Sequence, residues 1–256
     1  MPAPTNTFKQ RLLAGETLIG CWLSFGEAAP AEIMGSAGFD WLLIDGEHGP
    51  NDIRSIRDQL IALESSASSP VVRVPTGLDW VLKQTLDIGA QTILVPLVET
   101  ADEAEAVVKA CHYPTAGIRG VGAAAARSGR FGGIPDYVAT ADEQICVLVQ
   151  VESVKGVENL DAILAVDGVD GVFIGPADLS ADMGLKGNSK HPEAQKMICD
   201  ALDRITESGK PAGCLALDDE TAELYLAHGT RFLAVGIDVH LMINAARAKV
   251  AKYKPT

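Results

Sequence analysis

Short apolar runs alternate along this chain with segments in which apolar residues recur every three or four positions. The runs are rich in Val, Ile and Leu and end at Gly, Pro or an acidic residue, as is typical of parallel strands buried on both faces. We therefore predict eight strands, at Leu18–Leu23, Trp41–Asp45, Val71–Val74, Thr92–Pro96, Cys146–Glu152, Gly171–Gly175, Ala212–Leu215 and Phe232–Gly236.

Amphipathic helices are predicted between most of these strands. Ile56 and Leu60, for example, lie one helical turn apart after the second strand. Gly38, Gly89 and Gly209 each follow a helical segment, in the position where a left-handed residue often ends a helix. The predicted helices are Pro50–Leu63, Leu78–Ile88, Ala101–Cys111, Val157–Val166, Pro192–Ser208 and Asp218–His228.

Alternation of strands and helices predicts an α/β protein with a parallel sheet, and eight strands in 256 residues favour a closed (β/α)8 TIM barrel. We expect residues 1–256 to form this single domain. A doubly wound open sheet is the alternative, but the segment SFGEAAP after the first strand lacks the GxGxxG turn typical of that fold. The long insert from about Ala110 to Glu143 has the composition of a functional loop.

Composition narrows the classes of function. A net charge of −13 argues against binding to nucleic acid or to an anionic membrane. No apolar stretch approaches the roughly 20 residues that span a bilayer, and the first residues do not resemble a signal peptide. The cysteines are scattered without a CxxC pair, which favours free buried thiols and a cytoplasmic location. They are Cys21, Cys111, Cys146, Cys199 and Cys214.

Polar residues cluster where the predicted strands end, which is where the active site of such a barrel lies. Asp45, Glu47 and His48 follow the second strand, and Arg73 lies at the end of the third. Gln150 and Glu152 end the fifth strand, and the sixth runs into Gly175, Pro176, Ala177 and Asp178. We expect these side chains to share one pocket.

Glu152 and Asp178 end consecutive strands, so their carboxylates should lie close enough to bind one hard divalent ion, Mg²⁺ or Mn²⁺. The alternative is that each acid merely caps the helix that follows it. The turn Gly175-Pro176-Ala177 is also placed to present backbone N–H groups to a carboxylate.

Arg73 and His48 are the candidate reactive groups. Arg73 lies between valines, so we interpret it as a fork for a carboxylate or a developing oxyanion, with a structural ion pair as the alternative. His48 is a candidate general base, and Asp45 is placed to orient its imidazole or raise its basicity. The alternative for His48 is an ordinary surface group. No lysine lies on a predicted strand, which disfavours a Schiff base and favours metal-assisted carbonyl chemistry.

Several long motifs resemble the metal-dependent pyruvate aldolases of the HpcH/HpaI family. The resemblance extends from about Gly20 to Val239 and includes GFDWLLIDGEHGP, PVVRVP, QTILVPLVETADEA, AGIRGVGAAAAR, VLVQVES and GVDGVFIGPADLSADMG. It implies reversible cleavage of a 4-hydroxy-2-oxo acid, such as 4-hydroxy-2-oxoheptanedioate, into pyruvate or hydroxypyruvate and an aldehyde. The segment RSGRFGGIPDY departs from the family pattern and leaves the aldehyde preference open.

The resemblance also implies roles for single residues. It makes Glu152 and Asp178 the ligands of Mg²⁺, Mn²⁺ or Co²⁺, and Arg73 the group that stabilises developing negative charge. It makes His48 the acid–base group, with Asp87 reaching in from a neighbouring subunit to raise its basicity. The implied substrate contacts are Gln150, Gly175, Pro176, Ala177 and Asp178, with Trp22 and Leu215 in the pocket wall.

The resemblance further implies a homohexamer built from dimers that exchange their last helix, here about His240 to Lys252. Three other interpretations stay open. Aldolases of 2-keto-3-deoxy sugar acids have similar motifs, and CoA-thioester lyases of the malyl-CoA and citramalyl-CoA type share the two acidic metal ligands. A metabolite-binding subunit without catalytic activity would lack one member of the constellation, and none is missing.

Overall fold

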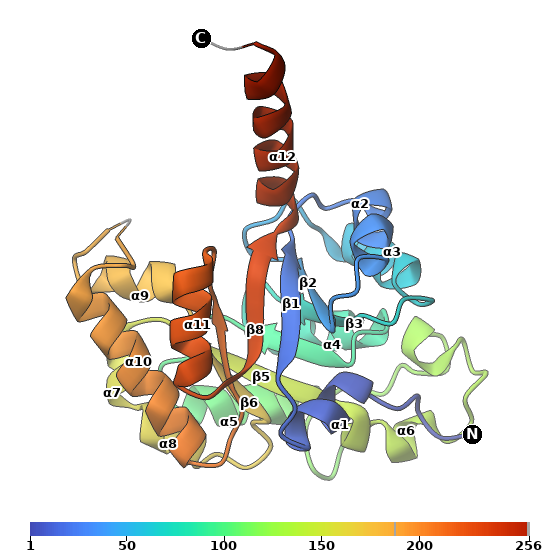
Figure 1. Cartoon of the computed structure of the whole chain (residues 1–256). Helices are drawn as coiled ribbons and strands as arrows, with labels where there is room; N and C mark the ends of the chain where they lie inside the picture. Colours follow the sequence, from blue (N-terminus) through green and yellow to red (C-terminus); the bar gives the residue numbers. More distant parts are fainter. Residues whose placement is uncertain (187, 255–256) are drawn as a thin grey trace.

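The computed structural model describes residues 1–186 and 188–254 and consists of a closed barrel of eight parallel strands, each hydrogen-bonded to the next and β8 to β1 (Figure 1). The (β/α)8 prediction is confirmed. The strands are β1 (Leu18–Leu23), β2 (Trp41–Asp45), β3 (Ser69–Arg73), β4 (Thr92–Val95), β5 (Cys146–Val151), β6 (Gly171–Ile174), β7 (Ala212–Leu215) and β8 (Thr230–Ile237).

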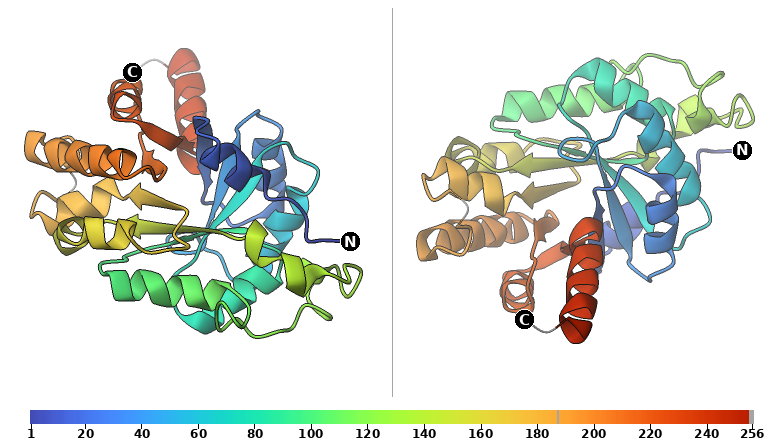
Figure 2. Two further views of the ribbon diagram at one scale, coloured as in Figure 1. Left: turned by 90° about the horizontal axis from the view of Figure 1, so that it is seen from below. Right: turned by 90° about the horizontal axis from the view of Figure 1, so that it is seen from above.

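Helices surround this barrel and return the chain from the carboxyl end of each strand to the amino end of the next (Figure 2). The helices are α1 (Thr7–Leu13), α2 (Ala28–Gly35), α3 (Ile53–Ala62), α4 (Asp79–Asp87), α5 (Ala101–Cys111), α6 (Tyr137–Thr140), α7 (Val154–Glu158), α8 (Leu160–Leu164), α9 (Pro176–Asp182), α10 (Pro192–Glu207), α11 (Asp219–Ala227) and α12 (Asp238–Tyr253). None of the described helices is long and apolar enough to cross a membrane.

The expected single helix Val157–Val166 is wrong, because the segment forms two short helices, α7 and α8, that meet at Asn159. Asn159 leaves the helical conformation, and its side-chain amide donates to the backbone oxygen of Glu99 at 2.9 Å. A tertiary hydrogen bond therefore overrides the local helical pattern. The three glycines expected to end helices, Gly38, Gly89 and Gly209, do have positive φ.

The barrel interior is filled by side chains from alternate strand positions, as the two-residue period of a strand requires. Trp41 and Phe232 contact each other with ring centroids 6.1 Å apart, and Phe8 of α1 packs edge-on against both rings. Helix α1 therefore closes the amino-terminal end of the barrel. Gly20 and Gly213 leave room for the Trp41 and Phe232 rings, because a Cβ at either glycine would overlap the ring.

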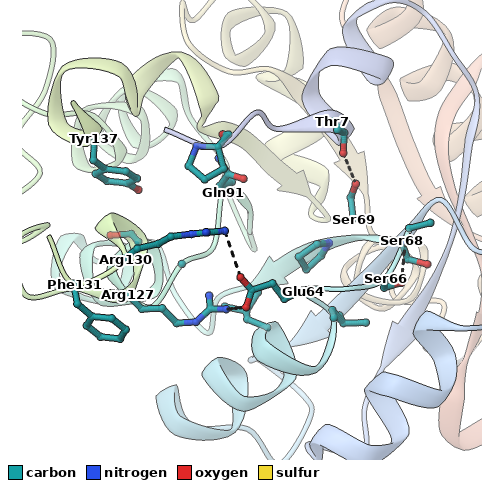
Figure 3. Close-up of a pocket in the computed structure, with 17 residues that line it drawn as sticks. Thr7, Glu64, Ser66, Ser68, Ser69, Gln91, Arg127, Arg130, Phe131 and Tyr137 are labelled. Atoms are coloured by element: carbon teal, nitrogen blue, oxygen red, sulfur yellow. Dashed lines mark hydrogen bonds and ion pairs between the residues drawn. The ribbon is translucent and has the colours of Figure 1, made fainter. Parts of the chain in front are cut away.

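The insert between α5 and β5 lies at the amino-terminal end of the barrel, because it joins the end of a helix to the start of a strand. A hollow of about 550 Å³ separates part of it from α3. Figure 3 shows the Glu64 carboxylate between Arg127 and Arg130, at 3.1 and 3.5 Å from their guanidinium nitrogens. Two ion pairs with Glu64 thus hold the insert, which we expected to be a functional loop, at the end of the barrel opposite the strand exits.

The surface of α12 is mostly uncovered. The helix extends from the carboxyl end of β8 away from the barrel (Figure 1), and Leu241, Met242 and Val250 are exposed on it. The five cysteines, in contrast, are free and buried in the barrel and its helical layer, as the sequence predicts.

Replacing Gly20 with alanine should lower the free energy of unfolding by about 1–3 kcal/mol, since the new methyl group must displace the buried Trp41 ring. Urea unfolding followed by circular dichroism measures this. Gly236→Ala on the neighbouring β8 is the control, because its added Cβ meets Cys21 Sγ at an ordinary 3.5 Å. Equal stability of the two variants would contradict this account of the barrel interior.

Candidate active site

The same alternation that fills the barrel interior also brings the polar residues together at its mouth. Leu43 and Val71 belong to the interior cluster, and Asp45 and Arg73 lie two positions further along the same strands. Asp45 and Arg73 are also register partners between β2 and β3. Gln150 follows the interior residue Leu148 of β5 in the same way. The inward face of each strand is therefore apolar along its length and polar at its carboxyl end.

Arg73 is held from three sides. Its Nε and Nη2 donate to the two Asp45 carboxylate oxygens at 2.9 and 2.8 Å, and its Nη1 lies 3.0 Å from Glu47 Oε2. The guanidinium also lies 5.5 Å from the ring centroid of Trp22. Two of its five N–H groups donate to Asp45. The contact with Glu47 is an ion pair, because Glu47 Oε2 accepts no hydrogen bond among the described residues, so three N–H groups in a nearly buried position remain for an anionic ligand. Trp22, predicted in the pocket wall, therefore lies against Arg73.

His48 lies at the edge of this cluster, with its side chain 65% exposed. The expected contact between Asp45 and the imidazole is not present among the described residues. Asp45 instead accepts from Arg73 and from the backbone N–H groups of Glu47 and His48, at 3.1 and 3.2 Å. The Asp45 carboxylate therefore fixes the turn. The imidazole Nε2 lies 4.0 Å from the Glu47 carboxylate.

Glu152 is buried at the centre of the mouth, and each of its oxygens accepts one hydrogen bond. Oε1 accepts from the backbone N–H of Leu97 at 2.9 Å, and Oε2 accepts from the side-chain amide of Gln150. Gly175 leaves the necessary space, because a Cβ there would overlap Glu152 Oε2. Burial raises the pKa of Glu152 to about 7, and the negative charges of Asp178 and Glu47 act in the same direction.

These residues fit a divalent cation. Three carboxylates, Glu47, Glu152 and Asp178, influence one another electrostatically. In the described part of the chain, the buried Oε1 of Gln150 has no hydrogen-bond partner. Within residues 1–186 and 188–254, no set of three acidic, histidine or cysteine side chains forms a complete metal cage. A cation here would therefore be held by two carboxylates and completed by oxygens of water and substrate, as Mg²⁺ and Mn²⁺ accept.

The turn after β6 carries the remaining predicted contacts. Gly175 precedes α9, Pro176 is the first helical residue, and Ala177 and Asp178 follow in the exposed first turn. Because first-turn N–H groups have no partner within the helix, those of Ala177 and Asp178 are available to an anion, whereas Pro176 has no N–H to offer. Leu215 packs against the same interior cluster as Trp22.

Asp87 is not part of this mouth in its own chain. It ends α4, so it lies toward the amino-terminal end of the barrel, and its carboxylate accepts from Arg119 Nη2 at 2.9 Å. Arg119 is buried, and its guanidinium carbon lies 4.4 Å from the centroid of the Tyr113 ring. Among the described residues its Nε and Nη1 have no hydrogen-bond partner. The insert is thus built around a buried arginine that pairs with Asp87.

Two site residues received no role in the sequence analysis. Glu47 was noted only as part of the exit motif, and its ion pair with Arg73 becomes visible in three dimensions. Asp238, just after β8, is buried and accepts from the N–H groups of Ser24 and Phe25 at 2.9 and 3.4 Å. It ties the β1 exit to the start of α12. For both, the available signal was an acid within two residues of the end of a strand.

Comparison with known proteins places this geometry in a family. The model of the HpcH/HpaI aldolase/citrate lyase family matches residues 18–245. A hydroxypyruvate/pyruvate aldolase of Roseobacter denitrificans is 59% identical, with 99% of each chain covered. A 4-hydroxy-2-oxo-heptane-1,7-dioate aldolase of Escherichia coli is 52% identical, with 97% of this chain and 95% of that protein covered.

Among solved structures, an HpcH/HpaI aldolase/citrate lyase family protein of Burkholderia cenocepacia superposes with a TM-score of 0.95 at 40% identity, covering 98% of this chain and 100% of the other. These matches span nearly the whole chain, and they confirm the resemblance and the aldolase type of enzyme that the motifs predict. The chain belongs to the HpcH/HpaI aldolase/citrate lyase family.

Proposed function

We propose that this chain is a divalent-metal-dependent aldolase that reversibly cleaves 4-hydroxy-2-oxo acids into pyruvate or hydroxypyruvate and an aldehyde. The observation that carries the proposal is the meeting of Arg73, fixed by Asp45 and Glu47, with the buried acid Glu152 at one barrel mouth. The relatives named for hydroxypyruvate/pyruvate and for 4-hydroxy-2-oxo-heptane-1,7-dioate support this range of substrates.

In this proposal Glu152 and Asp178 hold the ion, and a bound Mg²⁺, Mn²⁺ or Co²⁺ supplies Lewis-acid polarisation of the keto group. The first-turn N–H groups of Ala177 and Asp178 orient the substrate carboxylate. Gln150 Oε1 faces the part of the substrate that becomes pyruvate or hydroxypyruvate. The N–H groups of Arg73 that do not donate to Asp45 stabilise the negative charge that develops on the keto oxygen. Loss of such support typically raises a barrier by about 2.7–4 kcal/mol.

His48 moves the proton. Its exposed imidazole lies beside the mouth, where it removes the proton of the C4 hydroxyl during cleavage and returns it during condensation. The apolar wall of Trp22 and Leu215 orients the carbon chain. The buried thiols support a reducing, cytoplasmic setting for this chemistry.

We further propose a homohexamer built from dimers that exchange α12. The exposed Leu241, Met242 and Val250 support an exchanged helix, since apolar side chains on a protruding helix are stabilised by a partner's barrel. Asp87 in its own chain is at the far end of the barrel, so it can serve His48 only from a neighbouring copy. Its pairing with the rigid Arg119 supports that presentation.

Glu152→Gln should abolish metal-dependent pyruvate release, by about 10³-fold or more, while the barrel stays folded, because the amide cannot bind a hard cation as a carboxylate does. A lactate dehydrogenase-coupled assay with and without chelator measures this. The control is Glu105→Gln, which changes an exposed ion pair on α5 and should leave turnover unchanged. Full chelator-sensitive turnover in Glu152→Gln would refute the assignment.

The metal-free protein should become less stable as the pH rises. The folded state holds the Glu152 proton up to about pH 7, whereas an unfolded glutamate releases it near pH 4.3. The stabilisation is therefore complete below the unfolded pKa and lost as the pH rises through the folded pKa. Urea unfolding should show a loss of roughly 3–4 kcal/mol across this range, relative to Glu152→Gln. Identical pH dependence in both proteins would contradict the assigned pKa.

His48→Ala and Asp87→Ala should each be inactive alone but regain part of the activity when their subunits are mixed and reassembled. In a mixed assembly an intact His48 meets an intact Asp87 from the neighbour. The readout is pyruvate release after joint refolding, and His48→Ala mixed with Arg73→Ala is the control, because both residues lie in the same chain's mouth. No recovery in the first mixture would exclude a shared site.

A further inference from the structure

An exposed leucine beside Glu152 has an unusual backbone conformation. Leu97, two residues after β4, has φ +52, in the left-handed region that residues other than glycine rarely adopt. Its side chain is 59% exposed, so apolar packing does not hold it there. A leucine without packing support would relax to negative φ unless another interaction fixed it.

In the other two described non-glycine residues with positive φ, local hydrogen bonds explain the conformation. Arg130 and Phe131 lie in the insert, where short-range turn hydrogen bonds fix them: the N–H of Arg130 donates to Arg127 at 2.8 Å and that of Phe131 to Ala126 at 3.0 Å. The N–H of Leu97 makes no such turn. It donates to the side chain of Glu152, 55 residues later, at 2.9 Å.

Neighbouring contacts bind the same segment to the end of β5. The N–H of Val98 donates to the backbone oxygen of Gln150 at 3.0 Å, and Val98 itself is buried. Glu99 accepts from the Ser153 hydroxyl at 2.7 Å and pairs with Lys155 at 2.9 Å. On the other side, Val95 of β4 is paired with Val149 of β5. With both flanks fixed, the left-handed turn at Leu97 decides where its N–H points.

We infer that Leu97 is a positioning residue, whose left-handed backbone directs an N–H at Glu152 Oε1 and so presets that carboxylate for the cation. The inference rests on the proposed function of Glu152. A carboxylate whose Oε1 is fixed from one side and whose Oε2 is fixed by Gln150 has lost its rotational freedom before the ion arrives. Metal affinity should therefore depend on how well residue 97 tolerates positive φ.

Three substitutions separate backbone conformation from side-chain loss, because all of them keep the N–H. Asparagine and glycine tolerate positive φ, whereas a β-branched valine strongly resists it. Mn²⁺ binding to the metal-stripped, full-length protein, followed by electron paramagnetic resonance, should be within about threefold of wild type for Leu97→Asn and Leu97→Gly. It should weaken by about tenfold or more for Leu97→Val.

Leu78→Val is the matched control. Leu78 is also an exposed leucine just before a helix that follows a strand exit, but its φ of −65 suits valine, so Mn²⁺ affinity should not change. Wild-type affinity in Leu97→Val would overturn the inference, and so would equal weakening in Leu78→Val. A uniform loss across all three Leu97 variants would also overturn it, because the side chain rather than the backbone would then matter.

A metal-free measurement separates this inference from the proposed function. The Leu97 amide should be protected from hydrogen exchange in the metal-stripped protein and should lose that protection in Glu152→Ala. Unchanged protection in Glu152→Ala would show that the hydrogen bond is absent and overturn the inference. If the wild-type protein bound no Mn²⁺ while this protection was seen, the metal-dependent function would fail and the Leu97–Glu152 contact would stand.

Discussion

The burial of the Glu152 carboxylate at the barrel mouth is the constraint around which the rest of the site is arranged. A carboxylate removed from water is unfavourable unless hydrogen bonds or a cation compensate it. The chain provides two hydrogen bonds, from Leu97 and Gln150, and a glycine at position 175 that leaves room for the oxygens. Burial raises the pKa of Glu152 to about 7 in spite of these hydrogen bonds. In our proposal a divalent ion compensates the charge of this carboxylate.

The positive charge of Arg73, in the same barrel mouth, has a different role. Arg73 donates two hydrogen bonds to Asp45 and pairs with Glu47, so its charge is neutralised on one side, and three of its N–H groups are not used by Asp45. Trp22 packs against its face and limits its movement. The Arg73 guanidinium and the Glu152 carboxylate are each fixed by their own hydrogen bonds. Fixed charges of opposite sign suit a reaction that moves charge from a carbon chain onto a keto oxygen.

The two ends of the barrel carry different groups. The strand exits hold the candidate reactive groups, whereas α1, Asp87 and the insert lie at the other end. In our proposal, assembly places Asp87 of one chain beside the strand exits of a neighbouring chain. Arg119 is buried and stacked on Tyr113, and it fixes the Asp87 carboxylate through an ion pair. The fixed position of Asp87, far from His48 of its own chain, is explained if Asp87 enters the barrel mouth of a neighbouring chain.

Much of this could be predicted from the sequence, because strands have a period of two and parallel barrels collect their carboxyl ends at one face. Those rules alone bring Asp45, Arg73, Gln150 and Glu152 together, and the family motifs add Asp87. The sequence did not determine that Asp45 serves Arg73 instead of the imidazole, that Glu47 joins the pair, or that Asn159 divides a helix. These outcomes depend on which of several nearby partners a side chain reaches, and only the tertiary structure sets those distances. The left-handed turn at Leu97 is of the same kind: leucine has no local preference for it, and a hydrogen bond to a residue 55 positions away imposes it.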